Sequence, residues 1–171
     1  MTGTPGRPAS VRLLEPDEYE VARALVRRTW EISYAELFSP EDIAAFFDGP
    51  RPPRDDAQGF WPLGRWGAFL GARLVGSSSL EMREDGNAEL RTLYVDPDRQ
   101  GRGAGRALWD AAVERARAER AGAFIVRTLA RAPALEFYRH LGAEEIGRGT
   151  LPVGRCVART VILRLELAPR S

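Results

Sequence analysis

Three glycines at alternate positions form the part of the sequence best suited to bind a ligand. Gly101, Gly103 and Gly105 follow a predicted strand and open an amphipathic helix. Glycine allows a tight turn and leaves no Cβ in the way of a ligand. The N–H groups of such a loop and of the first helical turn point toward one place, which favours an anion such as a pyrophosphate. Arg102 and Arg106 add positive charge beside it.

Glycine triplets also occur in ordinary turns, so the loop alone leaves both interpretations open. Two well-known phosphate-binding loops do not match it. A dinucleotide fingerprint places a glycine where Arg106 stands and an acid at the end of the next strand, where this chain has Arg127 and Thr128. A nucleotide P-loop needs Gly-Lys followed by Ser or Thr, which this sequence does not contain.

Two motifs resemble those of the GCN5-related N-acetyltransferase (GNAT) family. The segment 100–105, Gln-Gly-Arg-Gly-Ala-Gly, is similar to the family's acetyl-CoA signature, and the preceding Leu-Tyr-Val-Asp-Pro of 93–97 is similar to its fourth strand. The segment 134–143, Ala-Leu-Glu-Phe-Tyr-Arg-His-Leu-Gly-Ala, is similar to its second motif. The resemblance is strong from Ala88 to Gly147. It is weak over the N-terminal helices, where only Trp30-x-x-x-Tyr34 and Ser39-Pro40-Glu41 are similar.

The resemblance implies that acetyl-CoA binds along the strand, the glycine loop and the second motif. A backbone N–H near Val95 would then polarise the acetyl carbonyl. Arg131 stands where the family often has an asparagine that contacts the cofactor; arginine cannot accept a hydrogen bond, so this contact is changed or lost, although Arg131 can reach a phosphate. The implied cofactor-binding residues are Leu93, Tyr94, Val95, Gln100, Gly101, Arg102, Gly103, Ala104, Gly105, Arg106, Arg131 and Tyr138.

Acetyl transfer to an amine needs a base and a proton donor. An amine with a pKa near ~10 is mostly protonated at neutral pH, and the departing thiolate benefits from a proton. The resemblance assigns the donor role to Tyr138. Glu89, on the strand that leads into the glycine loop, is the preferred base, acting through water, with Glu81 on the neighbouring strand in reserve. The alternative interpretation of Glu89 is a solvated residue beside the Asp-Gly turn.

Aromatic residues near the N-terminus are candidates for the acceptor site. Trp30, Tyr34 and Phe38 are spaced as one helical stripe, a pattern more typical of a core. In the GNAT family, however, the first two helices and their connection form the acceptor wall. The resemblance therefore implies that Trp30, Tyr34 and Trp61 bind the acceptor.

Hydrophobic periodicity and turn residues predict one mixed α/β domain over residues 10–168, after a frayed, flexible tail at 1–9. The resemblance implies a GNAT-like central mixed sheet, mostly antiparallel, of about six to seven strands flanked by about four helices. Residues 51–63 are predicted to be a loop. The expected helices are 17–34, 40–47, 103–121 and 133–141, and the expected strands are 11–14, 66–70, 74–82, 88–95, 124–129, 143–147 and 157–167.

Composition excludes several other classes of protein. Forty-four per cent of the residues are hydrophobic, but no apolar run approaches the ~20 residues that cross a bilayer. The 25 Lys and Arg residues nearly balance 24 Asp and Glu residues, which argues against nucleic-acid or membrane-surface binding. Cys156 and His140 are the single cysteine and the single histidine, which disfavours a metal site and favours the reducing cytoplasm.

The sequence therefore predicts an acetyl-CoA-dependent N-acetyltransferase. It would move an acetyl group to a primary amine by direct transfer in a ternary complex, without metal, as a monomer or homodimer. The acceptor is either a small-molecule amine or a peptide amine. The alternatives are a non-catalytic acyl-CoA-binding or regulatory domain, and an acetyltransferase of protein N-termini or lysines.

Overall fold

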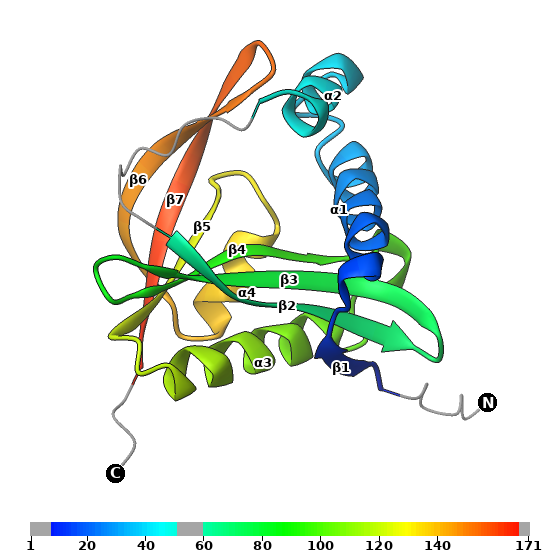
Figure 1. Cartoon of the computed structure of the whole chain (residues 1–171). Coiled ribbons are helices and arrows are strands. Elements are labelled where there is room, and N and C mark those ends of the chain that lie inside the picture. The colour runs from blue at the N-terminus through cyan, green and yellow to red at the C-terminus, as the bar shows by residue number, and fades with distance from the viewer. Residues whose placement is uncertain (1–7, 51–59, 168–171) are drawn as a thin grey trace, which may run out of the picture.

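A single mixed sheet forms the frame of the protein. The computed structural model describes residues 8–50 and 60–167, and within them seven strands follow the order β1-β2-β3-β4-β5-β7-β6 (Figure 1). Only the β4–β5 pair is parallel. The strands are β1 (Ser10–Leu13), β2 (Phe60–Leu70), β3 (Arg73–Arg83), β4 (Ala88–Val95), β5 (Ala123–Leu129), β6 (Glu144–Val153) and β7 (Cys156–Glu166).

Helices cover both faces of this sheet. The long helix α3 (Ala104–Ala118) and the short α4 (Ala134–His140) lie on one face, and α1 (Tyr19–Ser33) and α2 (Pro40–Asp48) lie on the other (Figure 1). Two short 3-10 turns, Pro16–Glu18 and Pro97–Arg99, precede α1 and follow β4. The start of α2 confirms the expected cap, because the Asp42 N–H donates to the Ser39 hydroxyl at 3.1 Å.

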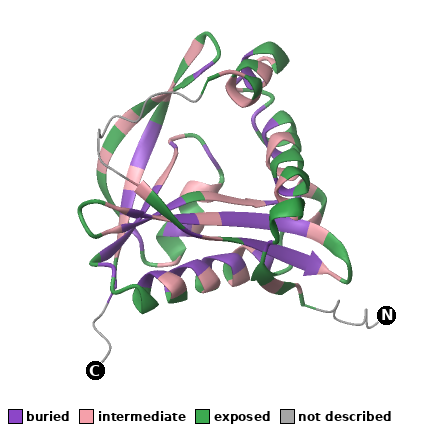
Figure 2. Cartoon of the chain, in the orientation of Figure 1, coloured by how far each residue is buried: buried purple, intermediate pink, exposed green. Residues whose placement is uncertain are grey.

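The main core lies between α3, α4 and the central strands, where Figure 2 shows buried residues on the inner side of α3. Leu108 of α3 and Phe124 of β5 are both 0% exposed. Trp109 packs edge-on against Phe124, with 4.9 Å between ring centroids, and also contacts Tyr138 of α4. Fully burying one such side chain contributes ~1.5–3 kcal/mol, so this packing holds α3 and α4 against the sheet.

The sheet opens between β4 and β5. Their parallel pairing runs only from Ala88 opposite Phe124 to Leu90 opposite Val126. On the other side of β4, a shift in the pairing with β3 leaves Arg91 as an extra residue. Beyond Leu90 the strands separate, and the main-chain edges of both face the gap.

A buried carboxylate joins α2 to the tip of the β6–β7 hairpin. Asp42 accepts hydrogen bonds from the Arg155 N–H at 2.8 Å and from the Ser39 hydroxyl at 2.9 Å. Gly154 in the hairpin turn has a φ of +56°, and a Cβ there would lie 2.4 Å from an Asp42 oxygen. The turn therefore needs glycine for both its conformation and its close contact with α2.

Two predicted strand boundaries were wrong. β2 starts at Phe60, inside the predicted loop, because residues 60–62 pair with β3; β6 continues past Gly147 to Val153, because it pairs with β7 along that length. α1 ends at Ser33, one residue from the predicted end at about Tyr34; Phe38 lies beyond the helix, yet the rings of Trp30, Tyr34 and Phe38 pack together. Residues 1–7 of the predicted tail, 51–59 of the predicted loop and residue 168 lie outside the described residues.

Candidate active site

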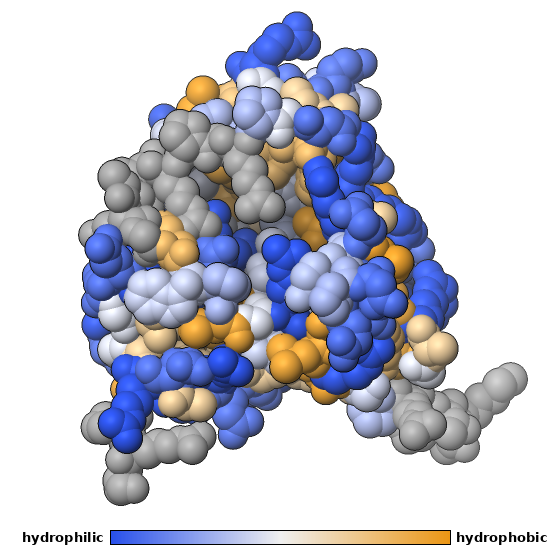
Figure 3. Space-filling view, viewed as in Figure 1, coloured by the Kyte–Doolittle hydropathy of each residue, from blue (hydrophilic) through white to orange (hydrophobic). Residues whose placement is uncertain are grey.

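A cleft of about 1250 Å³ runs through the gap between β4 and β5. One end reaches the glycine loop and the start of α3, and the other lies between α1, α2 and the sheet. Figure 3 looks toward this second end, where apolar surface lies in the hollow between the α1–α2 side and the β6–β7 side. The predicted residues among its lining are Trp30, Tyr34, Glu81, Glu89, Leu93, Tyr94, Val95, Gln100, Gly101, Gly103, Ala104, Gly105, Arg106 and Tyr138.

The glycine loop has the conformation of an anion-binding turn. Gly101 and Gly103 have φ values of +76° and +81°, in the left-handed region, and no heavy atom lies within 4 Å of a Cβ built on either. Gly103 is the N-cap of α3, and no side chain caps the helix there. The N–H groups of the first turn are therefore available to a ligand at the positive end of the helix dipole.

This loop fits the pyrophosphate of acetyl-CoA in shape and charge. Gly105 faces Phe137, 3.5 Å from its ideal Cβ position, so the helix start and α4 are in contact beside the cleft. Arg106 lines the cleft while pairing with Asp110 at 2.9 Å. Arg102 and Arg131 are exposed and lie outside the cleft lining, so their predicted contacts with the cofactor stay predictions.

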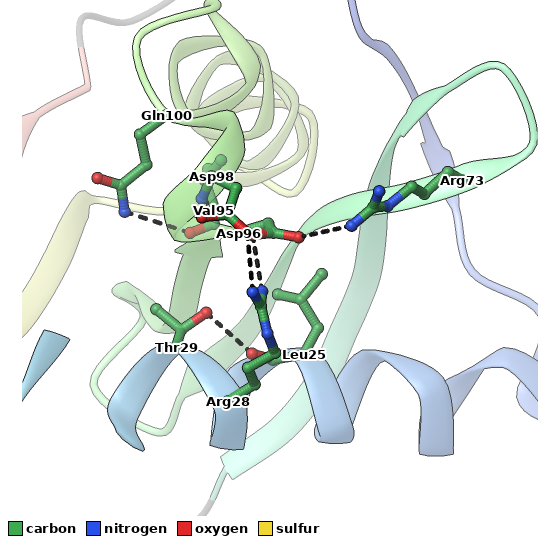
Figure 4. A network of polar contacts seen from close by, with 8 residues as sticks. All are labelled: Leu25, Arg28, Thr29, Arg73, Val95, Asp96, Asp98 and Gln100. Carbon is green, nitrogen blue, oxygen red and sulfur yellow. Dashed lines mark hydrogen bonds and ion pairs between the residues drawn. The ribbon is translucent and has the colours of Figure 1, made fainter. Parts of the chain in front are cut away.

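A salt-bridge network connects α1 to the segment that leads into the glycine loop (Figure 4). The buried Asp96 accepts from Arg28 of α1 at 2.8 Å and from Arg73 at 3.2 Å, and Arg28 also pairs with Asp98 at 2.9 Å. The Gln100 amide donates to the Val95 carbonyl at 3.3 Å. These contacts attach the segment that leads into the glycine loop to the end of β4 and to α1.

Tyr138 lines the middle of the cleft and is 4% exposed. Helix α4 positions it, with its ring 5.6 Å from Trp109 and 5.5 Å from Phe137. Burial raises the pKa of the Tyr138 phenol well above its usual range. The hydroxyl therefore stays protonated at neutral pH, as a hydrogen-bond or proton donor must.

Glu89 is not the solvated turn residue of the alternative interpretation, because it is only 1% exposed. One carboxylate oxygen accepts from Arg91 at 2.7 Å and the other from Arg83 at 3.0 Å. Arg91 also lies 3.6 Å from Glu81, so the two candidate bases share one guanidinium. A carboxylate oxygen has more than one lone pair, so a water can still bond to Glu89 beside the arginines.

The aromatic residues of α1 and α2 form one wall of the cleft. Trp30 stacks on Phe46 with ring centroids 4.7 Å apart, and Tyr34 meets Trp30 edge-on at 5.0 Å. Burial raises the pKa of Tyr34, so it is also uncharged. Trp61 lies on β2, is half exposed and is outside the cleft lining, so its role toward the acceptor stays a prediction.

Sequence reasoning missed several residues of the site. Arg91 lines the cleft, and its alternation with Glu89 along β4 was the available signal. Thr160 lines the cleft and is buried, and Phe46 lies on the wall, but both come from elements whose approach depends on the fold. Arg28 and Asp96 are 68 residues apart, so no local pattern joins them.

Among residues 8–50 and 60–167, no group of three or more His, Cys, Asp or Glu side chains is arranged to hold a metal ion. In the same part of the chain, no helix has the length and apolar character of a membrane span.

Solved structures of several N-acetyltransferases share this fold. A GCN5-related N-acetyltransferase from Rhodopseudomonas palustris has 23% identity and a TM-score of 0.75, covering 96% of this chain and 99% of its own. The PaiA N-acetyltransferase of Thermoplasma acidophilum, solved with coenzyme A, has 17% identity and a TM-score of 0.74, over 94% of this chain and 100% of its own. The Escherichia coli ribosomal-protein-S18-alanine N-acetyltransferase has 17% identity and a TM-score of 0.61, covering 95% of this chain and 96% of its own.

Sequence comparison assigns the family directly. A search of curated proteins finds no significant match. The model of the acetyltransferase (GNAT) family, however, matches residues 24–143, which include most of α1, the glycine loop and α4. The chain therefore belongs to the GNAT family of acetyltransferases.

Proposed function

We propose that this protein is an acetyl-CoA-dependent N-acetyltransferase that acts on a primary amine by direct transfer in a ternary complex. The observation that carries the proposal is the cleft through the β4–β5 gap. It joins an uncapped glycine-loop helix start to a chamber under α1 and α2, and Tyr138 and Glu89 line the passage between them. A donor and an acceptor can therefore meet at one point from two ends.

The residues around this point have separate roles in the proposed reaction. The N–H groups of the glycine loop and α3 hold the pyrophosphate, and main chain near Val95 at the open edge of β4 polarises the acetyl carbonyl. Glu89 takes a proton from the acceptor ammonium through water, which frees the nitrogen lone pair. As the C–N bond forms and the C–S bond breaks, Tyr138 donates a proton to the departing sulfur, and the extra proton of the attacking nitrogen then restores the Tyr138 hydroxyl. Bound acetyl-CoA supplies the activated acyl group.

The test is acetyl-CoA-dependent thiol release against amino acids, polyamines, aminoglycosides and short peptides, with Tyr138→Phe alongside. We expect this variant to lose ~10- to 1,000-fold in kcat while acetyl-CoA binds with nearly unchanged affinity, because only a hydroxyl is removed. Ser10→Ala removes an exposed hydroxyl on β1, outside the cleft lining, and serves as the control. Unchanged turnover in Tyr138→Phe would remove Tyr138 from the mechanism.

Two other outcomes would change the proposal. Tight acetyl-CoA binding without thiol release for any acceptor would indicate a binding or regulatory domain. Release only with peptides or proteins would indicate an acetyltransferase of N-termini or lysines.

A further inference from the structure

The acceptor end of the cleft has walls of different chemistry. This acceptor chamber is the part of the cleft between the aromatic residues of α1 and α2 and the inner face of β3, β4 and β7. Its aromatic side includes Phe46 and Phe47, which are only partly buried, with Leu151 of β6 beside them. An acceptor that occupies the chamber therefore meets an apolar surface on one side.

Hydroxyl groups line the opposite side. Ser79 and Thr92 bond to each other at 2.8 Å across β3 and β4. Thr160 of β7 is 2% exposed, and its hydroxyl has no hydrogen-bond partner within the described residues. A buried hydroxyl without a partner is unfavourable, so this position favours a ligand that carries a polar group.

The charges of the chamber do not suit a polycation. Among the described residues that line the cleft, the carboxylates are Glu20, Asp48, Glu81 and Glu89. Three of these four already pair with arginines: Asp48 with Arg27, and both Glu81 and Glu89 with Arg91. A polyamine or aminoglycoside needs several carboxylates that are not already neutralised.

Arg91 gives the chamber a fixed guanidinium. Its side chain is 32% exposed and is held by Glu89 at 2.7 Å and Glu81 at 3.6 Å. A guanidinium presents several N–H groups in a planar fork, so it can bond these acids and still donate to a ligand carboxylate. The same contacts place Arg91 next to the candidate base, where the acceptor nitrogen must lie.

We propose that the acceptor is a compact amino acid with an aromatic or branched apolar side chain, whose carboxylate binds Arg91 and whose side chain packs on Phe46 and Phe47. This inference rests on the proposed acetyltransferase function and specifies its substrate class. The α-amino group then lies beside Glu89, and Thr160 supplies a hydrogen bond to the polar end of the substrate.

The decisive experiment compares L-phenylalanine with phenethylamine, which lacks only the carboxylate, in wild type and Arg91→Gln. We expect wild type to prefer phenylalanine in kcat/KM by ~10-fold or more, because a charge-assisted hydrogen bond is lost with the carboxylate. Arg91→Gln should reduce this ratio to near one. A general loss of activity through Glu89 affects both substrates and cancels in the ratio. Arg117→Gln, on the outer side of α3, should keep the wild-type ratio.

A second comparison tests the apolar side. Phe46→Ala should lower the preference for phenylalanine over glycine by ~10-fold, since the ring loses an apolar partner. A preference for spermidine over phenylalanine, or equal use of phenylalanine and phenethylamine by wild type, would overturn the inference and leave the proposed function standing.

If acetyl-CoA binds but no acceptor releases thiol, the proposed function fails. Calorimetric titration of L-phenylalanine into the protein saturated with coenzyme A then decides the chemistry of the chamber. Saturable binding that Arg91→Gln weakens would support the amino-acid chamber, and no binding would overturn it.

Discussion

Replacing Gly103 by alanine tests whether the left-handed turn at the start of α3 binds the cofactor. Gly103 has a φ of +81° and no heavy atom within 4 Å of an added Cβ, so Gly103→Ala changes backbone strain without a clash. A left-handed alanine costs ~1–2 kcal/mol, and the less flexible unfolded chain returns ~0.4–1 kcal/mol. The net loss in the free energy of unfolding is therefore about 1 kcal/mol.

The matched control is Gly71→Ala in the β2–β3 turn. Gly71 has a φ of +61° and equally open surroundings, and it lies outside the cleft lining. Denaturant unfolding should show a similar loss of about 1 kcal/mol for both variants. The two variants should differ in acetyl-CoA binding alone.

Strain at position 103 is relieved when the residue leaves the left-handed region, which rotates the first-turn N–H groups away from the pyrophosphate. Acetyl-CoA can restore the left-handed turn only against this strain of ~1–2 kcal/mol, so Kd should rise by roughly 5- to 30-fold. Calorimetry should show this loss for Gly103→Ala and an unchanged Kd for Gly71→Ala. Equal affinities for acetyl-CoA in both variants would refute the assignment of the loop.

Three further predictions concern the base, the salt-bridge network and the core. Glu89→Gln should lower kcat by ~100-fold or more while acetyl-CoA binds with nearly unchanged affinity; an unchanged kcat in Glu89→Gln together with a loss in Glu81→Gln would transfer the role to Glu81. Burial opposes ionisation of Asp96, but hydrogen bonds from Arg28 and the Asp98 N–H outweigh it and lower its pKa below 3.8. The stability that this carboxylate contributes is therefore present above about pH 4 and is lost as the pH falls through the lowered pKa. Asp96→Asn should therefore flatten the decline of Tm in acid. A decline as steep as in wild type would contradict this prediction. Leu108→Ala should cost ~2–5 kcal/mol in urea unfolding, against less than ~0.5 kcal/mol for the half-exposed Ile32→Ala on α1, and equal losses would argue against the described core.

Local sequence was enough for much of this protein. The Ser39 cap, the glycine turn before α3 and the short helix that carries Tyr138 depend on residues within a few positions of one another, where backbone conformation and capping act. The order of strands and helices followed from hydrophobic periodicity, and the two motifs indicated the family. The predicted cofactor residues on β4 and the glycine loop are close in the sequence, and most of them line one cleft.

Only the tertiary structure decided the surroundings of these residues. Phe60 and the end of β6, which contains glycine and proline, belong to strands because neighbouring strands pair with them. This pairing overrides the weak strand preference of the local sequence. Glu89 follows an Asp-Gly turn and resembles a solvent residue in sequence, yet packing buries it and Arg83 and Arg91 hold its charge. The cleft exists because β4 and β5 part after Leu90, and its walls come from α1, α2 and β7, which are distant in the sequence. Such long-range contacts depend on which faces of the helices and strands pack against one another, and short sequence patterns do not contain this information.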